Sequence, residues 1–392
     1  MQRIEFYQPL WAMEQRRPGV AERPLEQQIA MIAEAGFRGV GLDLAMNDVP
    51  LANEARPLLE RHGLGCLFNG FPRSDDELRF MLAMAKDFGA PFLSVIGQVM
   101  PRDLPEMIAV ARRWIDIADG AGLPLLFETH RHGLLNDLYP TLSILEALPD
   151  LALCADLSHF IVDREFPPEP DPDSERMIAQ VLGRSMAFQG RVSSHEQIQV
   201  QIGFHQHQAW VERYFGWWDQ GLRSWRGRAP RDATVAFLCE LGPPPYAITG
   251  ADGLELSDRW SEALAIREGV SGLWLAMEAA DRAADLERVV TVGLGRFDGA
   301  ELLKSRVGWA DTDGGFGVEF PDSLDDHERL TPGLCIPGGS VRIHGGWGPD
   351  EPGGFEHIVR EKDYLDEVAR QLGQGGATPP TSGSPQTHPG EG

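Results

Sequence analysis

Short apolar runs alternate with longer segments of helical periodicity over most of the chain. Eight of these runs predict buried β-strands, which we place at residues 4–11, 37–44, 64–70, 91–99, 123–130, 151–159, 186–194 and 234–241. Apolar residues three or four positions apart predict helices at 24–36, 75–89, 104–122 and 174–185, and residues 257–269 begin a closing helical segment. Strands that alternate with helices are typical of a parallel sheet, and eight such units predict a (β/α)8 TIM barrel of the α/β class.

The alternation ends near residue 285, so we assign residues 1–285 to the barrel. Residues 286–373 are rich in Gly and Asp with short β-like runs, and 362–373 has the pattern of one more helix. We expect this C-terminal extension to act as a lid, a clasp or a dimer arm. Residues 374–392 are mostly Gly, Pro, Ser and Thr, which bury little apolar surface, and this composition predicts a disordered tail.

Charge and cysteine content restrict the partners and the compartment. The chain of 392 residues has 59 acidic and 35 basic residues, a formal net charge of −24, and such a surface repels nucleic acid and anionic lipid. No apolar stretch is long enough to predict a membrane-spanning helix, and the N-terminus lacks the pattern of a signal peptide. The four cysteines lie far apart, which is typical of reduced thiols. We expect a cytoplasmic protein that binds a small molecule, and whether it forms a homo-oligomer stays open.

Polar residues follow the last four predicted strands at the point where each strand ends. In chain order they are Glu128 and His130, Asp156 and His159, Gln189, Arg191 and His195, and Glu240. Because the carboxyl ends of barrel strands meet at one mouth, we expect these side chains to converge. Three carboxylates with neutral oxygen or nitrogen donors suit Mn²⁺, Mg²⁺, Co²⁺ or Zn²⁺, so we predict one divalent metal ion held at Glu128.

Four segments carry a resemblance to a known family: LLFETHRHGLLND, LPDLALCADLSHF, FQGRVSSHEQIQV and FLCELGPPPY. They resemble the strand-five to strand-eight motifs of the xylose-isomerase-like superfamily of sugar phosphate isomerases and epimerases, and the resemblance covers residues 1–285. It implies a TIM barrel whose metal ligands are Glu128, Asp156, Gln189 and Glu240. It also implies that His159, in an Asp-x-x-His pattern, contacts the substrate.

The seventh strand departs from the commonest form of the family, which has histidine where this chain has Gln189. An amide oxygen is usually a weaker ligand than imidazole for zinc-like ions, and His195 is the competing ligand. Residues two apart on a strand share a face, so Gln189, Arg191 and Ser193 are predicted to point the same way. His195 lies beyond the predicted strand end. We therefore expect Gln189 to bind the metal and His195 to reach a substrate hydroxyl or phosphate from a loop.

The implied chemistry is proton transfer at carbon. A metal beside two adjacent oxygens of a hydroxy-ketone or hydroxy-aldehyde stabilises an enediolate, while Glu128 and Glu240 take and return the carbon-bound proton. Arg191, His130 and His195 are expected to bind substrate with His159, and Trp11 is expected to form a pocket wall. Two active carboxylates suit epimerisation, whereas transfer on one side gives aldose–ketose isomerisation.

Other functions fit the same residues. A dehydratase or lyase would keep the metal but expel a group beside the enediolate, and a metal-free sugar-binding protein would have lost catalysis through the change at Gln189. Late-strand carboxylates also serve as helix caps or salt-bridge partners, which is a purely structural interpretation. Trp217, Trp218 and Trp225 are expected to pack against the barrel or in an interface, and a role in stacking on sugar is the alternative.

Overall fold

The computed structural model describes residues 2–294, 306–310, 316–319 and 342–344. Internal contacts divide the chain into two units, Met1–Trp274 and Leu275–Gly392. The second unit contains a three-stranded sheet in the order β11-β10-β9, formed by Arg342–His344, Phe316–Glu319 and Arg306–Ala310. The predicted helix at 362–373 and the predicted tail at 374–392 lie outside the described residues.

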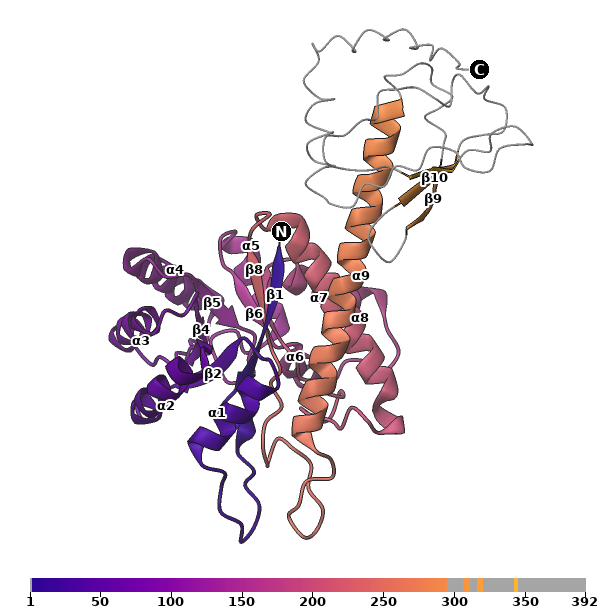
Figure 1. The fold of residues 1–392 in the computed structure, drawn as a ribbon. Helices are drawn as coiled ribbons and strands as arrows, with labels where there is room; N and C mark the ends of the chain where they lie inside the picture. The colour runs from indigo at the N-terminus through magenta and orange to yellow at the C-terminus, as the bar shows by residue number, and fades with distance from the viewer. Residues whose placement is uncertain (1, 295–305, 311–315, 320–341, 345–392) are drawn as a thin grey trace, which may run out of the picture. The chain divides into compact units, whose positions relative to one another are not determined.

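The first unit contains a closed barrel of eight parallel strands in the order of the sequence, with β8 paired to β1 (Figure 1). The strands are β1 Arg3–Pro9, β2 Gly39–Leu44, β3 Gly65–Gly70, β4 Leu93–Val95, β5 Leu125–Glu128, β6 Leu153–Ala155, β7 Ser185–Gln189 and β8 Thr234–Leu238. Each lies inside its predicted run or within one residue of it. The predicted (β/α)8 barrel is therefore confirmed.

Helices lie between successive strands around the barrel, and one more helix follows the last barrel strand (Figure 1). They are α1 Leu25–Glu34, α2 Val49–His62, α3 Asp75–Asp87, α4 Leu104–Ala121, α5 Leu138–Ala147, α6 Leu157–Asp163, α7 Pro172–Leu182, α8 Gln208–Arg228 and α9 Arg259–Leu294, with 3-10 turns η1 Trp11–Met13 and η2 His205–His207. Ser74 and Asp103 cap α3 and α4 through the backbone N–H groups of Glu77 and Glu106. These caps satisfy donors that have no partner inside the helix, and they set where each helix begins.

An apolar layer fills the barrel and fixes which strand positions point inward. Its buried members come from six strands, which can meet only inside the barrel: Tyr7, Leu67, Leu126, Cys154, Ala187, Ala236 and Leu238. Because side chains alternate along a strand, the residues two positions further on share this inward direction. On β5 and β7 those residues are Glu128 and Gln189, so the layer above the apolar core is polar.

Several predicted strands end earlier than expected, and the early end of β6 changes the setting of His159. β6 ends at Ala155, and the Asp156 side chain accepts a hydrogen bond from the Ser158 N–H, which starts α6. A carboxylate that bonds the backbone two residues on favours a helix start over a continued strand. His159 is therefore a helical residue. β7 likewise ends at Gln189, so Arg191 follows the strand.

Helix α8 packs its aromatic face against the barrel. Trp217, Trp218 and Trp225 are buried, which confirms their packing role. Gly221 lies on the same face, where an added Cβ would come within 2.5 Å of Phe188 Cε1. Gly216, on the same helix, is exposed and has no atom within 4 Å of the corresponding Cβ position. The helix therefore needs glycine at position 221 and not at position 216.

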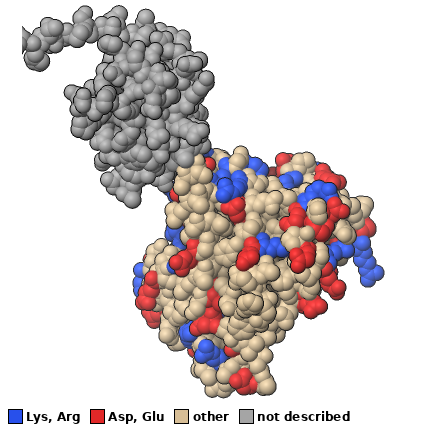
Figure 2. All heavy atoms as spheres, turned by 90° about the vertical axis from the view of Figure 1, so that its right-hand side faces the viewer, with Lys and Arg blue, Asp and Glu red and all other residues tan. Residues whose placement is uncertain are grey.

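The cysteines that the structure describes form no disulfide bond. Cys66, Cys154 and Cys239 are buried free thiols, and Cys335 lies outside the described residues. Among the helices that the structure describes, none has the length and apolarity to cross a membrane. Acidic and basic side chains are interspersed over the face shown in Figure 2.

Replacing Gly221 or Gly216 of α8 with alanine should change the stability of the protein in opposite directions. Gly221→Ala forces a methyl group into Phe188 and should lower the free energy of unfolding by about 1–3 kcal/mol. The methyl group added by Gly216→Ala has no neighbouring atom, so this variant should raise the free energy of unfolding by roughly 0.5–1 kcal/mol through better helix propensity. Urea denaturation followed by circular dichroism measures both. Equal effects of the two substitutions would contradict the close packing of α8 on β7.

Candidate functional site

Five predicted site residues form a buried polar group at the carboxyl ends of β5 to β8. Their exposed fractions are 2% for Glu128, 0% for Asp156, 1% for Gln189, 2% for Arg191 and 6% for Glu240. Charged side chains are seldom buried to this degree unless they are paired. The interactions within this group, which we call the mouth cluster, therefore decide what the site can do.

Arg191 connects two carboxylates of the mouth cluster. Its Nε donates to Asp156 Oδ2 at 3.1 Å, and its Nη2 donates to Glu240 Oε1 at 2.8 Å. The third nitrogen, Nη1, is buried and has no hydrogen-bond partner among the described residues. Arg191 therefore neutralises charge on two different strand ends and still has donor capacity to spare.

Glu128 and Gln189 form the other half of the mouth cluster. The Gln189 Nε2 donates to Glu128 Oε2 at 2.7 Å, which fixes the amide with its nitrogen toward the carboxylate. The Gln189 Oε1 and the Glu240 Oε2 are buried, and neither has a hydrogen-bond partner in the described part of the chain. Two acceptor oxygens thus lie buried without a donor.

Burial and mutual repulsion raise the pKa of two glutamates. Burial, followed by the charges of Glu240 and Asp156, raises the pKa of Glu128 well above its usual value. Burial also raises the pKa of Glu240 to about 7, although Arg191 acts in the opposite direction. The mouth cluster has three carboxylates and one guanidinium, so a further cation would relieve an excess of negative charge.

Asp156 differs from the two glutamates. Burial acts to raise its pKa, but Arg191, His159 and Ser158 together hold it below the usual range. Its Oδ1 accepts from the Ser158 N–H at 3.0 Å and from Ser158 Oγ at 2.5 Å, while Oδ2 receives Arg191. Asp156 is therefore both a helix cap and an ion-pair partner, and it stays ionised.

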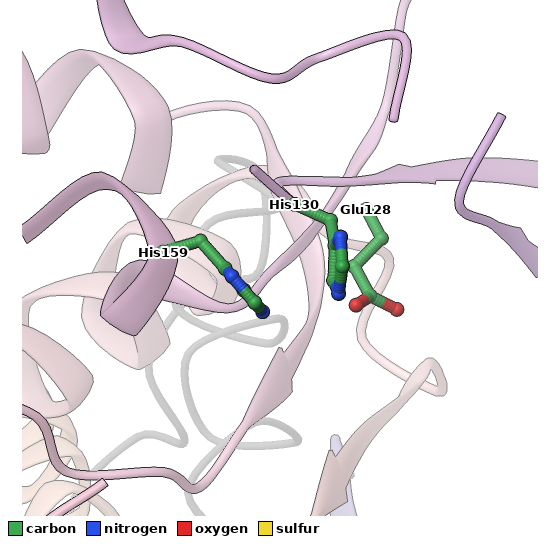
Figure 3. A group of neighbouring side chains, drawn as sticks. All are labelled: Glu128, His130 and His159. Atoms are coloured by element: carbon green, nitrogen blue, oxygen red, sulfur yellow. The ribbon is translucent and has the colours of Figure 1, made fainter. Parts of the chain in front are cut away.

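Two histidines lie beside Glu128, and His130 lies between Glu128 and His159 (Figure 3). The ligand atoms of these three residues fall within 4.8 Å of one another, and the imidazole centroids are 3.8 Å apart. Burial lowers the pKa of both imidazoles, that of His130 to about 2, and for His159 it outweighs the opposing effect of the Asp156 carboxylate. Both rings are therefore neutral at ordinary pH.

Hydrogen bonding assigns the His130 tautomer. Its Nδ1 lies 3.1 Å from the N–H of His132 and accepts that hydrogen bond. A neutral imidazole that accepts through Nδ1 carries its proton on Nε2. In this arrangement the His130 Nε2 carries the proton and is a hydrogen-bond donor.

The remaining predicted residues lie at the edge of the mouth. Trp11, in η1, packs edge-on against Tyr246 with ring centroids 5.6 Å apart, and the Arg191 guanidinium lies 4.6 Å from the Tyr246 ring centroid. Arg259, at the start of α9, donates to the carbonyls of Ala12, Glu14 and Leu241. These contacts hold Trp11 and Tyr246 as one wall beside Arg191.

His195 lies on the loop after β7, as the strand length predicts. Its Nδ1 is 3.1 Å from the Phe166 carbonyl oxygen, and its ring packs near Trp210 with centroids 5.7 Å apart. About 30% of the side chain is exposed. The structure therefore places Gln189 in the mouth cluster and His195 against a neighbouring loop.

Two further polar residues of the mouth lie on strands that we did not include among the candidates. Asp43 on β2 pairs in register with Asn69 on β3, and Asn69 is two positions beyond the inward-facing Leu67. Burial, with the charges of Glu240 and Asp48, raises the pKa of Asp43 to about 8. The rule that selected Glu128, a polar residue late in a strand, also selects GVGLDL and GCLFNG and could have found both.

The residues of the mouth cluster fit a divalent cation. Glu128, Asp156 and Glu240 supply carboxylate oxygens, and hard cations prefer oxygen ligands. The unpartnered Gln189 Oε1 and Glu240 Oε2 are buried acceptors of the kind that a cation satisfies. The His130 and His159 rings add neutral nitrogen atoms next to Glu128, although the His130 tautomer makes that ring a donor.

No family model and no curated protein matches the sequence. Solved structures that are similar in fold include a xylose isomerase-like TIM barrel protein from Mycobacterium smegmatis in complex with magnesium, with 14% identity and a TM-score of 0.44 over 69% of this chain and 97% of that one. An L-ribulose 3-epimerase has 18% identity and a TM-score of 0.47 over 71% and 98%. A probable 3-DHS dehydratase from Bacillus anthracis has 14% identity and a TM-score of 0.40 over 59% of this chain and 92% of that one. These are similarities of fold, and the function is inferred from this chain's own residues.

Asp43→Asn should change the pH dependence of stability. The folded-state pKa of Asp43 lies above the ordinary value of 3.8, so its stabilising contribution is present at low pH and is lost as pH rises toward about 8. The neutral variant avoids that loss. Its unfolding temperature, measured in chelator, should exceed that of the wild type at about pH 9 and match it more closely at about pH 5. A difference that does not grow with pH would contradict the environment described for Asp43.

Proposed function

We propose that the protein is a divalent-metal-dependent isomerase or epimerase of a small sugar, sugar phosphate or other hydroxy-carbonyl compound. The observation that carries this proposal is the pair of buried carboxylates, Glu128 on β5 and Glu240 after β8, which approach the mouth from different walls of the barrel. A substrate between them meets a proton acceptor on each of two sides. That arrangement suits removal and return of a carbon-bound proton.

Glu128, Asp156, Gln189 and Glu240 would hold the metal. When bound, the ion supplies positive charge beside the two adjacent oxygens of the substrate, where negative charge develops as the proton leaves. Asp156, kept ionised by Arg191, contributes negative charge to the shell. Gln189 contributes its amide oxygen, which in the structure has no hydrogen-bond partner among the described residues.

The protein side chains around the metal ligands would bind and orient the substrate. His130, with its proton on Nε2, can donate to a substrate oxygen, and His159 lies against it. The unpartnered Arg191 Nη1 offers a further donor. Trp11 and Tyr246 form an aromatic wall that can exclude water from one side of the reacting carbon. Two carboxylates in use give epimerisation, and one gives isomerisation.

A screen of ketoses, aldoses and their phosphates in deuterated water tests the reaction class. The proposal expects deuterium in recovered substrate and in an isomer or epimer, and this incorporation should need added Mn²⁺, Mg²⁺, Co²⁺ or Zn²⁺. Irreversible loss of water or of a carbon fragment would instead identify a dehydratase or lyase. Sugar binding without deuterium incorporation in the presence of each metal would identify a non-catalytic binding protein.

Glu128→Gln and Glu240→Gln should each lower the rate of deuterium incorporation by at least about a hundredfold, because each removes a proton-transfer group. His159→Ala should mainly raise KM. The exposed Glu146→Gln is the matched control and should leave the rate unchanged. Substantial exchange in both Glu128→Gln and Glu240→Gln would overturn the two-carboxylate mechanism.

Metal content should depend on Gln189 and not on His195. Gln189→Ala removes a buried oxygen donor and should lower the bound metal measured by elemental analysis of the purified protein. His195→Ala should leave metal content nearly unchanged and raise KM, since this residue lies on a loop beside Phe166 and Trp210. If His195→Ala loses the metal and Gln189→Ala retains it, the strand-seven ligand is an imidazole.

A further inference from the structure

Arg191 has the position of a built-in counter-ion for the mouth cluster. Its side chain is 2% exposed and bridges Asp156 and Glu240, which are two of the four residues proposed to hold the metal. A guanidinium and a divalent cation that share the same carboxylates repel each other in a site with little water. The Arg191 guanidinium that stabilises the metal-free protein therefore opposes the binding of the metal.

We propose that Arg191 competes with the divalent cation for Asp156 and Glu240, so that this single residue sets the metal affinity of the site. This inference rests on the proposed metal-dependent function. Without metal, the guanidinium offsets repulsion among three buried carboxylates, which would otherwise oppose folding. With metal, the guanidinium gives up part of its contact with the same carboxylates.

The hydrogen bonds of Arg191 leave its guanidinium able to shift. Arg191 uses only one oxygen of Glu240, and the other, Oε2, has no partner among the described residues. Its own Nη1 also has none, so the bridge leaves donor and acceptor capacity unused on both sides. A bidentate pair with every group satisfied would resist displacement far more strongly.

A second resting place for the guanidinium lies next to the first. The Tyr246 ring centroid is 4.6 Å from the Arg191 Cζ, and the Trp11 ring centroid is 6.0 Å away. An aromatic face attracts a guanidinium, and the attraction increases where water is excluded. Arg191 can therefore move its charge toward the aromatic wall when a cation takes its place at the carboxylates, without leaving the protein interior.

Calorimetric titration of the full-length, chelator-treated protein with Mn²⁺ alone tests the competition. Arg191→Met and Arg191→Gln both remove the positive charge. Circular dichroism shows which of the two folds, and the titration uses a folded variant. Each should bind Mn²⁺ about tenfold more tightly than the wild type, whereas Arg191→Lys, which keeps the charge, should stay within about threefold.

Arg184→Met is the matched control for the loss of one positive charge. Arg184 directly precedes β7, at the opposite end of the strand from Arg191, and donates to the carbonyls of Leu145, Leu148 and Leu151. Its Mn²⁺ affinity should equal that of the wild type. A similar tightening in Arg184→Met would show a general charge effect and overturn the competition.

The remaining outcomes separate this inference from the proposed function. Unchanged or weaker Mn²⁺ binding in the neutral Arg191 variants would overturn the competition and would leave the metal-dependent function standing. Binding to these variants but not to the wild type would support the competition and overturn the metal requirement. Binding to none of the proteins would overturn both.

Discussion

Burial of one guanidinium between two carboxylates is the constraint on which the mouth of the barrel depends. Removing ions from water is costly, and the cost is recovered only when geometry and hydrogen bonding are good. Arg191 meets Asp156 and Glu240 after three successive strands, so the ends of β6, β7 and β8 must come together for the bridge to form. Losing Arg191 would leave both buried carboxylates without this guanidinium.

The same bridge positions the neighbouring helix. Asp156 accepts from Arg191 through one oxygen and starts α6 through the other, so the ion pair and the helix cap share a single carboxylate. His159 lies one turn into α6 and is placed against His130 by that cap. The histidine pair beside Glu128 is in this way a consequence of the charge arrangement on the next strands.

The barrel could be predicted from the sequence because its signal is repeated. Each of eight apolar runs ends near a turn, and an error at one strand does not change the closed order of the others. Glu128 and Gln189 could be placed as well, because both lie on regular strands where alternation fixes direction. His195 was placed on a loop by the same rule.

The interactions inside the mouth cluster could not be predicted in the same way. Whether Asp156 continues a strand or caps a helix depends on a competition between local hydrogen bonds that the apolar pattern does not report. The choice of partners by Arg191 depends on distances between residues that are far apart in the chain. Asp43 and Asn69 were within reach of the late-strand rule, but the polar candidates all came from the last four strands.

The contacts of Arg259 also bear on the order in which the protein can assemble during synthesis. The segment with Trp11 is made before seven of the eight strands, yet the strand that pairs with β1 is β8 and the side chain that holds the Ala12 and Glu14 carbonyls is Arg259. Neither partner exists until more than half of the chain has been made. Domains generally begin to fold while they are translated, and contacts distant in sequence form slowly. The aromatic wall of the pocket, though encoded at the start of the chain, is therefore completed only after every other strand of the barrel has been made.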